Sequence, residues 1–208
     1  MLQKFKQISA VFTAKKLGKF GDFAILKSDL FGAKVAPEVA EKLQSVEGYY
    51  PLIDLDKLRQ YPLGTFGREY ADHMQMNHLK ALNISPELVD VAQRNVFALR
   101  YAVTHDIFHV LLGFDTTYAG EIGVLAFAAE QNYSKSLKIS LKLAQFLYPI
   151  LAPQQSQMIC ANLNKGQKLG KKADFLLGYR FEEHWQEPIE ELRKSLGLVE
   201  VTPHRHLA

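Results

Sequence analysis

Cysteine is almost absent from this sequence of 208 residues, since Cys160 is the only one. A single thiol forms no internal disulfide and excludes every zinc or iron–sulfur site that is built from several cysteines. Any metal site must therefore use histidine and carboxylate side chains. A chain of this length buries a core large enough to need no disulfide or metal, so we expect one domain over residues 1–208.

Long hydrophobic runs are also missing. No stretch of about eighteen apolar residues occurs, so no membrane-spanning helix is predicted. The first residues lack the continuous apolar region and the cleavage site of a secretory signal. The charge is small, with 25 Lys+Arg against 22 Asp+Glu and a formal net charge of +3 at pH 7. This balance does not indicate nucleic acid, so we expect none among the partners.

Acidic residues are missing from the N-terminal segment, where no Asp or Glu precedes Asp22. Lysines and apolar residues at helical spacing share this stretch: Lys4, Lys6, Lys15, Lys16 and Lys19, with Phe5, Ile8, Val11 and Phe12. Residues 1–30 are therefore predicted to form a basic amphipathic segment. Such a segment either covers the core as a solvated helix or contacts an anionic membrane surface.

Helix start and stop signals dominate the rest of the chain. Ser85 followed by Pro86 is typical of a helix start, and Gly113 supplies a left-handed stop. We therefore expect one helix from Pro86 to Leu112. Further helices are predicted over residues 37–43, 54–59, 65–82, 116–131, 153–169 and 188–196.

The segment from Ser134 to Leu147 fits two patterns. Apolar residues at 137, 139, 141 and 143 alternate as in a strand, while those at 137, 141, 144 and 148 have helical spacing. We predict a helix because no partner strand is evident. The fold class is therefore expected to be all-α, a single-domain helical bundle.

The segment with the clearest chemistry is His105-Asp-Ile-Phe-His109, which Glu121 follows after eleven residues. His105 and His109 are four residues apart, so on a helix they share one face and are able to bind one ion. If the helices on either side of Gly113 form an antiparallel hairpin, the rise of about 1.5 Å per residue places Glu121 between the two histidines in height. Asp106 is a fourth ligand, an orienting group for an imidazole, or a general base.

Burial of Asp106 and Glu121 among apolar residues would be costly without a cation, which favours a metal site. Two histidines with carboxylates suit a divalent ion, namely zinc, iron, manganese or magnesium. A metalloprotease would need a Glu between the histidines. A phosphohydrolase of the His-Asp type would need an upstream histidine, His73 or His78, and a downstream carboxylate, Asp115. It would have no use for the second histidine at 109.

At this motif the sequence resembles the ubiquinone (coenzyme Q) biosynthesis protein 4 family. The signature of that family is His-Asp-x-x-His, eleven residues, then Glu, and His105, Asp106, His109 and Glu121 match it at every position. The resemblance covers about residues 35–198. It includes Leu63–Gly67 with Tyr70, Arg100-Tyr101, Leu111–Gly113, Gly120–Ile122, Gln131, Trp185, Glu187, Leu192-Arg193 and Leu196-Gly197.

The resemblance implies an all-α fold and a peripheral membrane role with polyprenylated quinone precursors. It implies metal-dependent oxidative decarboxylation, which replaces the carboxylate at carbon one of the head group with a hydroxyl. His105, Asp106, His109 and Glu121 would then be metal ligands and catalytic residues. The alternative is a non-enzymatic scaffold that presents the lipid to other quinone biosynthesis proteins.

Without a clear mitochondrial presequence, the chain looks bacterial, and we expect a cytoplasmic protein peripheral at the inner face of the membrane. The apolar surplus suggests a homodimer.

Two arginines are candidates for binding a substrate head group. The helix that starts after Thr65 presents free N–H groups that bind anions, and Arg68 would add charge there; otherwise this is an ordinary helix start with Arg68 in solvent. Arg100, a turn and a half before His105, would pair with a substrate carboxylate or with Asp106.

Aromatic residues surround the motif: Phe97, Tyr101, Phe108, Phe114, Tyr118 and Phe127. They form either ordinary core or, as the resemblance implies, the wall of a tunnel for an isoprenoid tail. In the second interpretation Tyr101 and Phe108 contact the substrate.

Overall fold

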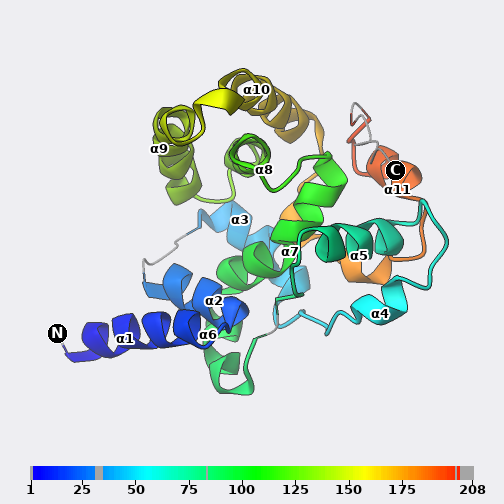
Figure 1. The fold of residues 1–208 in the computed structure, drawn as a ribbon. Coiled ribbons are helices and arrows are strands. Elements are labelled where there is room, and N and C mark those ends of the chain that lie inside the picture. The colour runs from blue at the N-terminus through cyan, green and yellow to red at the C-terminus, as the bar shows by residue number, and fades with distance from the viewer. Residues whose placement is uncertain (1, 31–34, 83, 200, 202–208) are drawn as a thin grey trace.

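The computed structural model describes residues 2–30, 35–82, 84–199 and 201, and these residues form α-helices and short 3-10 turns without any strand. The all-α prediction is confirmed (Figure 1). The helices are α1 (Leu2–Lys16), α2 (Phe20–Leu30), α3 (Pro37–Lys42), α4 (Leu55–Leu58), α5 (Phe66–Met76), α6 (Val89–Arg94), α7 (Val96–Leu112), α8 (Tyr118–Glu130), α9 (Lys135–Leu151), α10 (Ser156–Lys172) and α11 (Ile189–Ser195).

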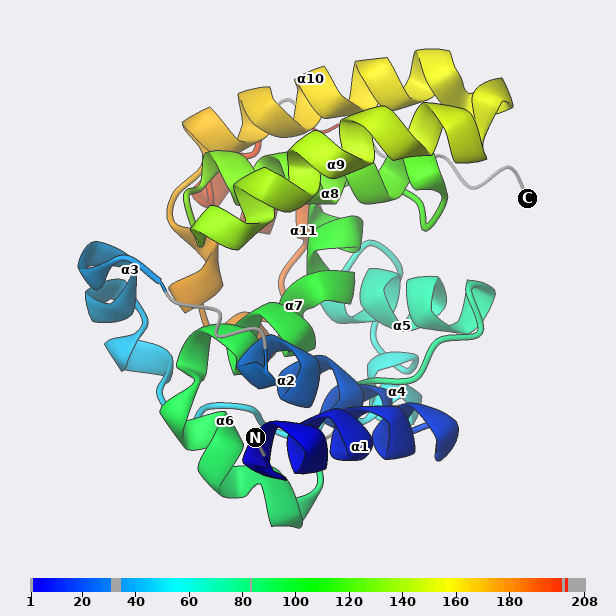
Figure 2. The same ribbon diagram turned by 90° about the vertical axis from the view of Figure 1, so that its left-hand side faces the viewer.

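Helix α7 crosses the middle of the molecule (Figures 1 and 2). Helices α8, α9 and α10 lie on one side of it, and α1, α2 and α6 lie on the other. Residues such as Leu99, Ile107 and Leu111 are fully buried, and burial extends around most of the helix. An α-helix that is apolar on all sides is typical of a core position. The motif histidines are therefore carried by the most enclosed helix of the fold.

Helices α8 and α10 approach each other closely because glycines face each other across their contact. A Cβ atom on Gly166 of α10 would run into the carbonyl oxygen of Gly123 on α8. The two backbones consequently pack at a distance that a larger side chain would not allow. This contact holds α8, which carries Glu121, against α10.

Substitution Gly166→Ala is expected to destabilise the protein by about 1–3 kcal/mol, because the added methyl group forces the two backbones apart. The free energy of unfolding in urea measures this effect. Lys168→Ala is the matched control, since that side chain is exposed on the same helix. Equal stability of the Gly166→Ala variant and the control would contradict the close packing.

Two helix boundaries differ from the prediction. The helix expected from Pro86 to Leu112 is interrupted at Asn95, whose Oδ1 accepts a hydrogen bond from the N–H of Ala98 at 3.1 Å. Asparagine favours an N-cap over a helix interior, so α6 ends and α7 begins there. The helix expected to reach Leu82 ends at Met76, because the Asn77 side chain donates a hydrogen bond to the carbonyl of His73.

Other start and stop signals are confirmed. Gly113 has a φ of 66° at the end of α7, as its left-handed role requires. Thr117 accepts from the N–H of Gly120 at the start of α8, and Ser134 accepts from the N–H of Leu137 at the start of α9. The segment with two possible patterns is therefore a helix.

The N-terminal segment packs as two helices, with α1 against α2 and α2 against α7. Val11 and Ala14 of α1 are buried, while Phe12 is exposed. Asp22 of α2 accepts hydrogen bonds from the backbone and hydroxyl of Ser85, at 2.7 and 2.6 Å. Lys4, Phe5 and Lys6 lie outside the residues whose side chains the structure describes. Among the described helices, none is both long and apolar enough to span a membrane.

Candidate metal centre

His105 and His109 lie on one face of α7, and Glu121 in the first turn of α8 completes a group of three. The Nε2 atoms of the two histidines are 3.3 Å apart. Glu121 Oε2 lies 3.4 Å from His105 Nε2, and Glu121 Oε1 lies 3.3 Å from His109 Nε2. All three ligand atoms lie within 4.8 Å of one another. Such an arrangement is able to hold one metal ion.

The three ligands converge, but the predicted antiparallel hairpin is not confirmed. In Figure 1 α8 is seen nearly end-on, whereas α7 runs across the view, so the two helices cross. Glu121 still reaches the histidines because it lies one turn from the start of α8. The turn after Gly113 closes tightly against this point, since a Cβ on Gly120 would collide with the carbonyl oxygen of Asp115.

His109 is held in the orientation that a ligand needs. Its ring is 1% exposed, and its Nδ1 lies 3.3 Å from the carbonyl oxygen of Phe114. A carbonyl only accepts, so Nδ1 is the donor in this contact, and Nε2 is the nitrogen that faces Glu121. Metal-binding histidines commonly use this arrangement of the second nitrogen. His105 and Glu121 are about a third exposed, at 31% and 35%, so the site opens on their side.

Electrostatics couple the three side chains. Burial alone would raise the pKa of Glu121, but hydrogen bonds from His105 and His109 outweigh it and lower that pKa to about 2. Burial opposes a charge on His105, yet Glu121 and Asp106 outweigh burial and raise its pKa. The carboxylate is therefore ionised at neutral pH and supplies the negative charge that a cation needs.

Asp106 is separate from the group of three, since in the described part of the chain the converging ligand atoms belong only to His105, His109 and Glu121. Burial raises the pKa of Asp106, and the two histidines partly offset this effect. Its direct ligation of a metal stays a prediction, as does its role as a base.

Two tyrosines, Tyr101 and Tyr148, lie near the ligands. The ring of Tyr101 meets His105 edge-on at 6.0 Å between centroids, and burial raises the pKa of its hydroxyl well above the usual range. Tyr148 of α9 contacts Tyr118 at 5.0 Å, and burial together with the charge of Glu121 raises its pKa. These hydroxyls stay protonated and are available as hydrogen-bond donors.

Sequence analysis did not assign Tyr148 or His73 to the site. The ring of His73 stacks on that of His109 at 5.9 Å between centroids. Both residues come from other helices, and only the histidine type of His73 marked it as a candidate. A pocket of about 630 Å³ lies on this side of His109, and its polar lining includes Glu69, His73, Asn77, Asp115 and Arg193.

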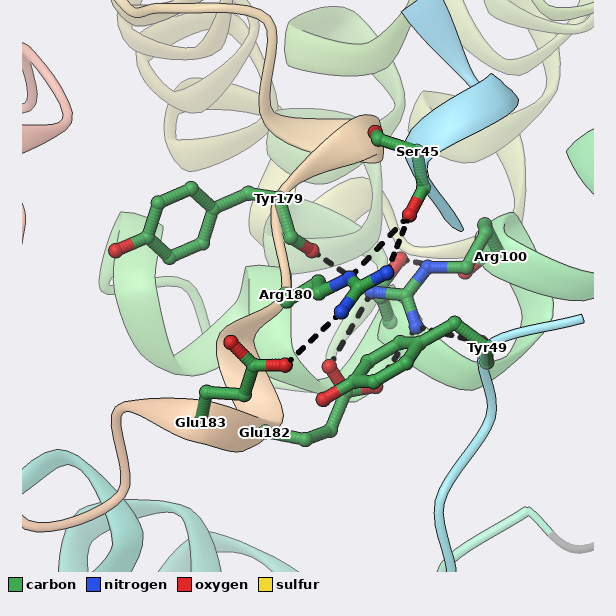
Figure 3. A network of polar contacts seen from close by, with 8 residues as sticks. Ser45, Tyr49, Arg100, Tyr179, Arg180, Glu182 and Glu183 are labelled. Atoms are coloured by element: carbon green, nitrogen blue, oxygen red, sulfur yellow. Dashed lines mark hydrogen bonds and ion pairs between the residues drawn. The ribbon is translucent and has the colours of Figure 1, made fainter. Parts of the chain in front are cut away.

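Arg100 does not contact Asp106, so that interpretation is wrong. Its guanidinium is fully buried and donates to Glu182 Oε1 at 2.8 Å and to the carbonyls of Tyr179 and Tyr49 at 2.9 and 3.2 Å (Figure 3). Next to it, Arg180 lies over the ring of Tyr49. Arg100 thus joins α7 to the segments of Tyr49 and Tyr179. Glu182 occupies the guanidinium that was predicted to bind a substrate carboxylate.

The anion site expected at the start of α5 is not formed. The N–H groups of Phe66 and Gly67 donate to the carbonyls of Glu187 and Trp185, both at 2.8 Å. Arg68 pairs with Asp72 at 2.8 Å and donates to a backbone carbonyl. The donors predicted to bind a head group are therefore already paired within the protein.

Phe108 lies in the core and not beside the three ligands. It is fully buried and packs on Phe127, Tyr133 and Phe181, with centroids 5.8 to 6.2 Å apart. Its predicted role in lipid binding finds no support in these contacts, because its ring is enclosed by the chain itself.

Together the fold and the site define an all-α protein with a candidate metal centre of two histidines and one carboxylate. The sequence profile of the family described as "Coenzyme Q (ubiquinone) biosynthesis protein Coq4" matches residues 49–202, and the chain belongs to this family.

The relatives of the chain include one protein from cattle and one from humans. Proteins named "Ubiquinone biosynthesis protein COQ4 homolog, mitochondrial" from Bos taurus and Homo sapiens are each 32% identical to it, over 150 and 155 residues. These matches cover 71% and 73% of this chain but only 56% and 57% of those proteins. The chain therefore spans little more than half the length of these relatives. A crystal structure from Nostoc punctiforme shares the fold, with a TM-score of 0.63 and 24% identity over 92% of this chain and 94% of that one.

Proposed function

We propose that this member of a coenzyme Q biosynthesis family removes the head-group carboxylate of a prenylated hydroxybenzoate by metal-dependent oxidative decarboxylation. The carboxylate at carbon one leaves as carbon dioxide and a hydroxyl takes its place, which is a net two-electron oxidation of the ring. Dioxygen is the oxidant: one of its oxygen atoms enters the hydroxyl, and the other leaves as water with two electrons and two protons from a reductant. The observation that carries the proposal is the convergence of His105, His109 and Glu121. The family membership supplies the substrate class.

The donor set fits a divalent ion with open coordination positions. Two imidazole nitrogens and one carboxylate are used by zinc hydrolases and by non-haem iron oxygenases. Zinc and magnesium do not exchange electrons, so an oxidative reaction selects iron or manganese among the candidate ions. Such an ion, when bound, would supply the electron exchange with the oxidant.

The remaining chemistry belongs to the chain. His109 is fixed through Phe114, and the open side near His105 and Glu121 gives a substrate access to the site. The hydroxyls of Tyr101 and Tyr148 stay protonated beside Glu121 and are placed to donate hydrogen bonds to a phenolate or carboxylate head group.

Product formation should depend on the identity of the metal. We expect purified protein loaded with iron(II) or manganese(II) to convert a prenylated hydroxybenzoate in air, with a reductant supplied, into the hydroxylated product. Zinc-loaded protein should form none. Mass spectrometry of the extracted lipid measures the product, and Glu121→Gln should remove it. Equal product with zinc would contradict an oxidative role for the metal.

The same experiment separates the alternatives. If no metal gives product, while the protein still binds the lipid and recruits other quinone biosynthesis proteins, the chain is a scaffold with a structural metal.

A phosphohydrolase is the weaker alternative, because none of its candidate ligands His73, His78 and Asp115 joins the ligand group in the described residues. Asp115 instead accepts from the backbone and hydroxyl of Thr117, at 3.0 and 2.6 Å. Phosphatase activity on prenyl phosphates would support this alternative against ours.

A further inference from the structure

We infer that the outer face of α9 binds the surface of an anionic lipid bilayer. Four large apolar side chains lie on this face: Ile139 and Phe146 are 68% exposed, Leu143 is 57% exposed and Ile150 is 62% exposed. Their spacing of four, three and four residues places them in one stripe along the helix. Single exposed apolar residues are common on proteins, but a continuous stripe of this kind marks an interaction surface.

The opposite face of α9 is occupied by the protein itself. Leu137, Leu141 and Ala144 are buried, and Tyr148 is half-buried on the same side. The helix therefore carries two apolar stripes on opposite sides, which is why its sequence alternates like a strand. The core accounts for only one of them, so the outer stripe needs an external partner.

The charge of the surrounding sequence selects that partner. Lys135, Lys138 and Lys142 are exposed, and helical spacing places all three along one edge of the outer stripe. Between Glu130 and Asp174 the sequence has seven lysines and no acidic residue. An apolar stripe edged by lysines is the pattern of a helix that lies in the interface of an anionic bilayer. Lysine stems extend along the lipid while their ammonium groups reach the head groups.

A second copy of the chain fits this surface less well. Two copies related by a two-fold axis would bring the same face of α9 together in both subunits. The lysines along that face have no acidic partners on α9 or α10, so the pairing would place like charges near each other. An anionic surface satisfies both the apolar stripe and the lysines.

The position of α9 links this surface to the metal centre. The charge of Glu121 raises the pKa of Tyr148, which lies on the inner side of the helix. Helix α9 therefore separates the outer stripe from the site. A helix is about 10 Å across, so the metal centre would lie within reach of a lipid in the bilayer. Helix α1, which carries exposed Phe12 and Lys15, lies on the opposite side of α7 from α9, but both helices lie at the left of Figure 1 and face the viewer in Figure 2.

Vesicle flotation of the full chain tests the inference without metal or substrate, so it holds or fails independently of the proposed reaction. We expect binding to vesicles of equal parts phosphatidylcholine and phosphatidylglycerol, and little binding to phosphatidylcholine alone. Leu143→Ser/Phe146→Ser should weaken partitioning by about tenfold or more. Lys135→Glu/Lys138→Glu/Lys142→Glu should weaken it by about 100-fold or more.

Matched controls lie elsewhere on the surface. Leu52→Ser removes an apolar side chain that is even more exposed, at 83%, and should leave partitioning unchanged. Lys15→Glu/Lys16→Glu removes exposed charge from α1 and should have a smaller effect than the changes in α9. Unchanged partitioning of the α9 variants, or a loss caused by the α1 variant alone, would overturn the inference. So would a wild-type dimer in sedimentation velocity that Leu143→Ser/Phe146→Ser converts to monomer while vesicle binding is absent throughout.

Discussion

Replacement of His109 by alanine is expected to weaken the binding of a divalent metal by at least about 100-fold, since loss of a mere outer-shell partner already costs about 10–100-fold. His109 contributes one of the three ligand atoms, and its Nε2 lies 3.3 Å from both His105 Nε2 and Glu121 Oε1. Elemental analysis of the purified wild type and isothermal titration of the metal-free proteins measure the effect. One equivalent of metal in the wild type is the expected starting point.

Two further variants make this prediction decisive. His109 is buried, so alanine also leaves a cavity, whereas Glu121→Gln changes a partly exposed side chain and should lose affinity without unfolding. His78→Asn is the control, because it removes an exposed imidazole and keeps a residue that tolerates the positive φ of 53° at that position. Metal bound equally by all variants would show that the three residues are not ligands.

The metal centre could be predicted from sequence because most of its geometry is local. The four-residue spacing of His105 and His109 fixes their shared face once the segment is helical. Glu121 required more, namely the path of the turn after Gly113. The hairpin expected there is not confirmed, yet Glu121 reaches the site because it lies in the first turn of α8. A wrong prediction of the angle between two helices changes the expected positions of residues near their junction only slightly.

The other predicted contacts failed because their partners come from distant parts of the chain. Arg100 and Glu182 are 82 residues apart. The carbonyls that take the N–H groups of Phe66 and Gly67 belong to the segment around residue 186. Nothing in residue type or spacing distinguishes an arginine that pairs within the core from one that binds a substrate. Tyr148 could not be predicted as a site residue for the same reason, because only the packing of α9 brings it near Glu121.

Separation of the buried pair of Arg100 and Glu182 is the second large effect that we expect. Their side chains are 0% and 3% exposed, and the guanidinium joins α7 to the segments of Tyr49 and Tyr179 (Figure 3). Glu182→Gln leaves a buried positive charge without its counter-ion, which should destabilise the protein by about 3–5 kcal/mol. For a chain of this size that lowers the melting temperature by roughly 6–20 °C.

The exposed pair of Arg59 and Asp56 offers the matched control. Its oxygen–nitrogen distance of 2.7 Å is as short as that of the buried pair, but water screens it, so Asp56→Asn should cost less than about 1 kcal/mol. The double change Arg100→Met/Glu182→Leu should recover much of the stability lost in Glu182→Gln, because it removes both buried charges together. Equal destabilisation by Glu182→Gln and Asp56→Asn in thermal unfolding would show that burial does not set the strength of this contact.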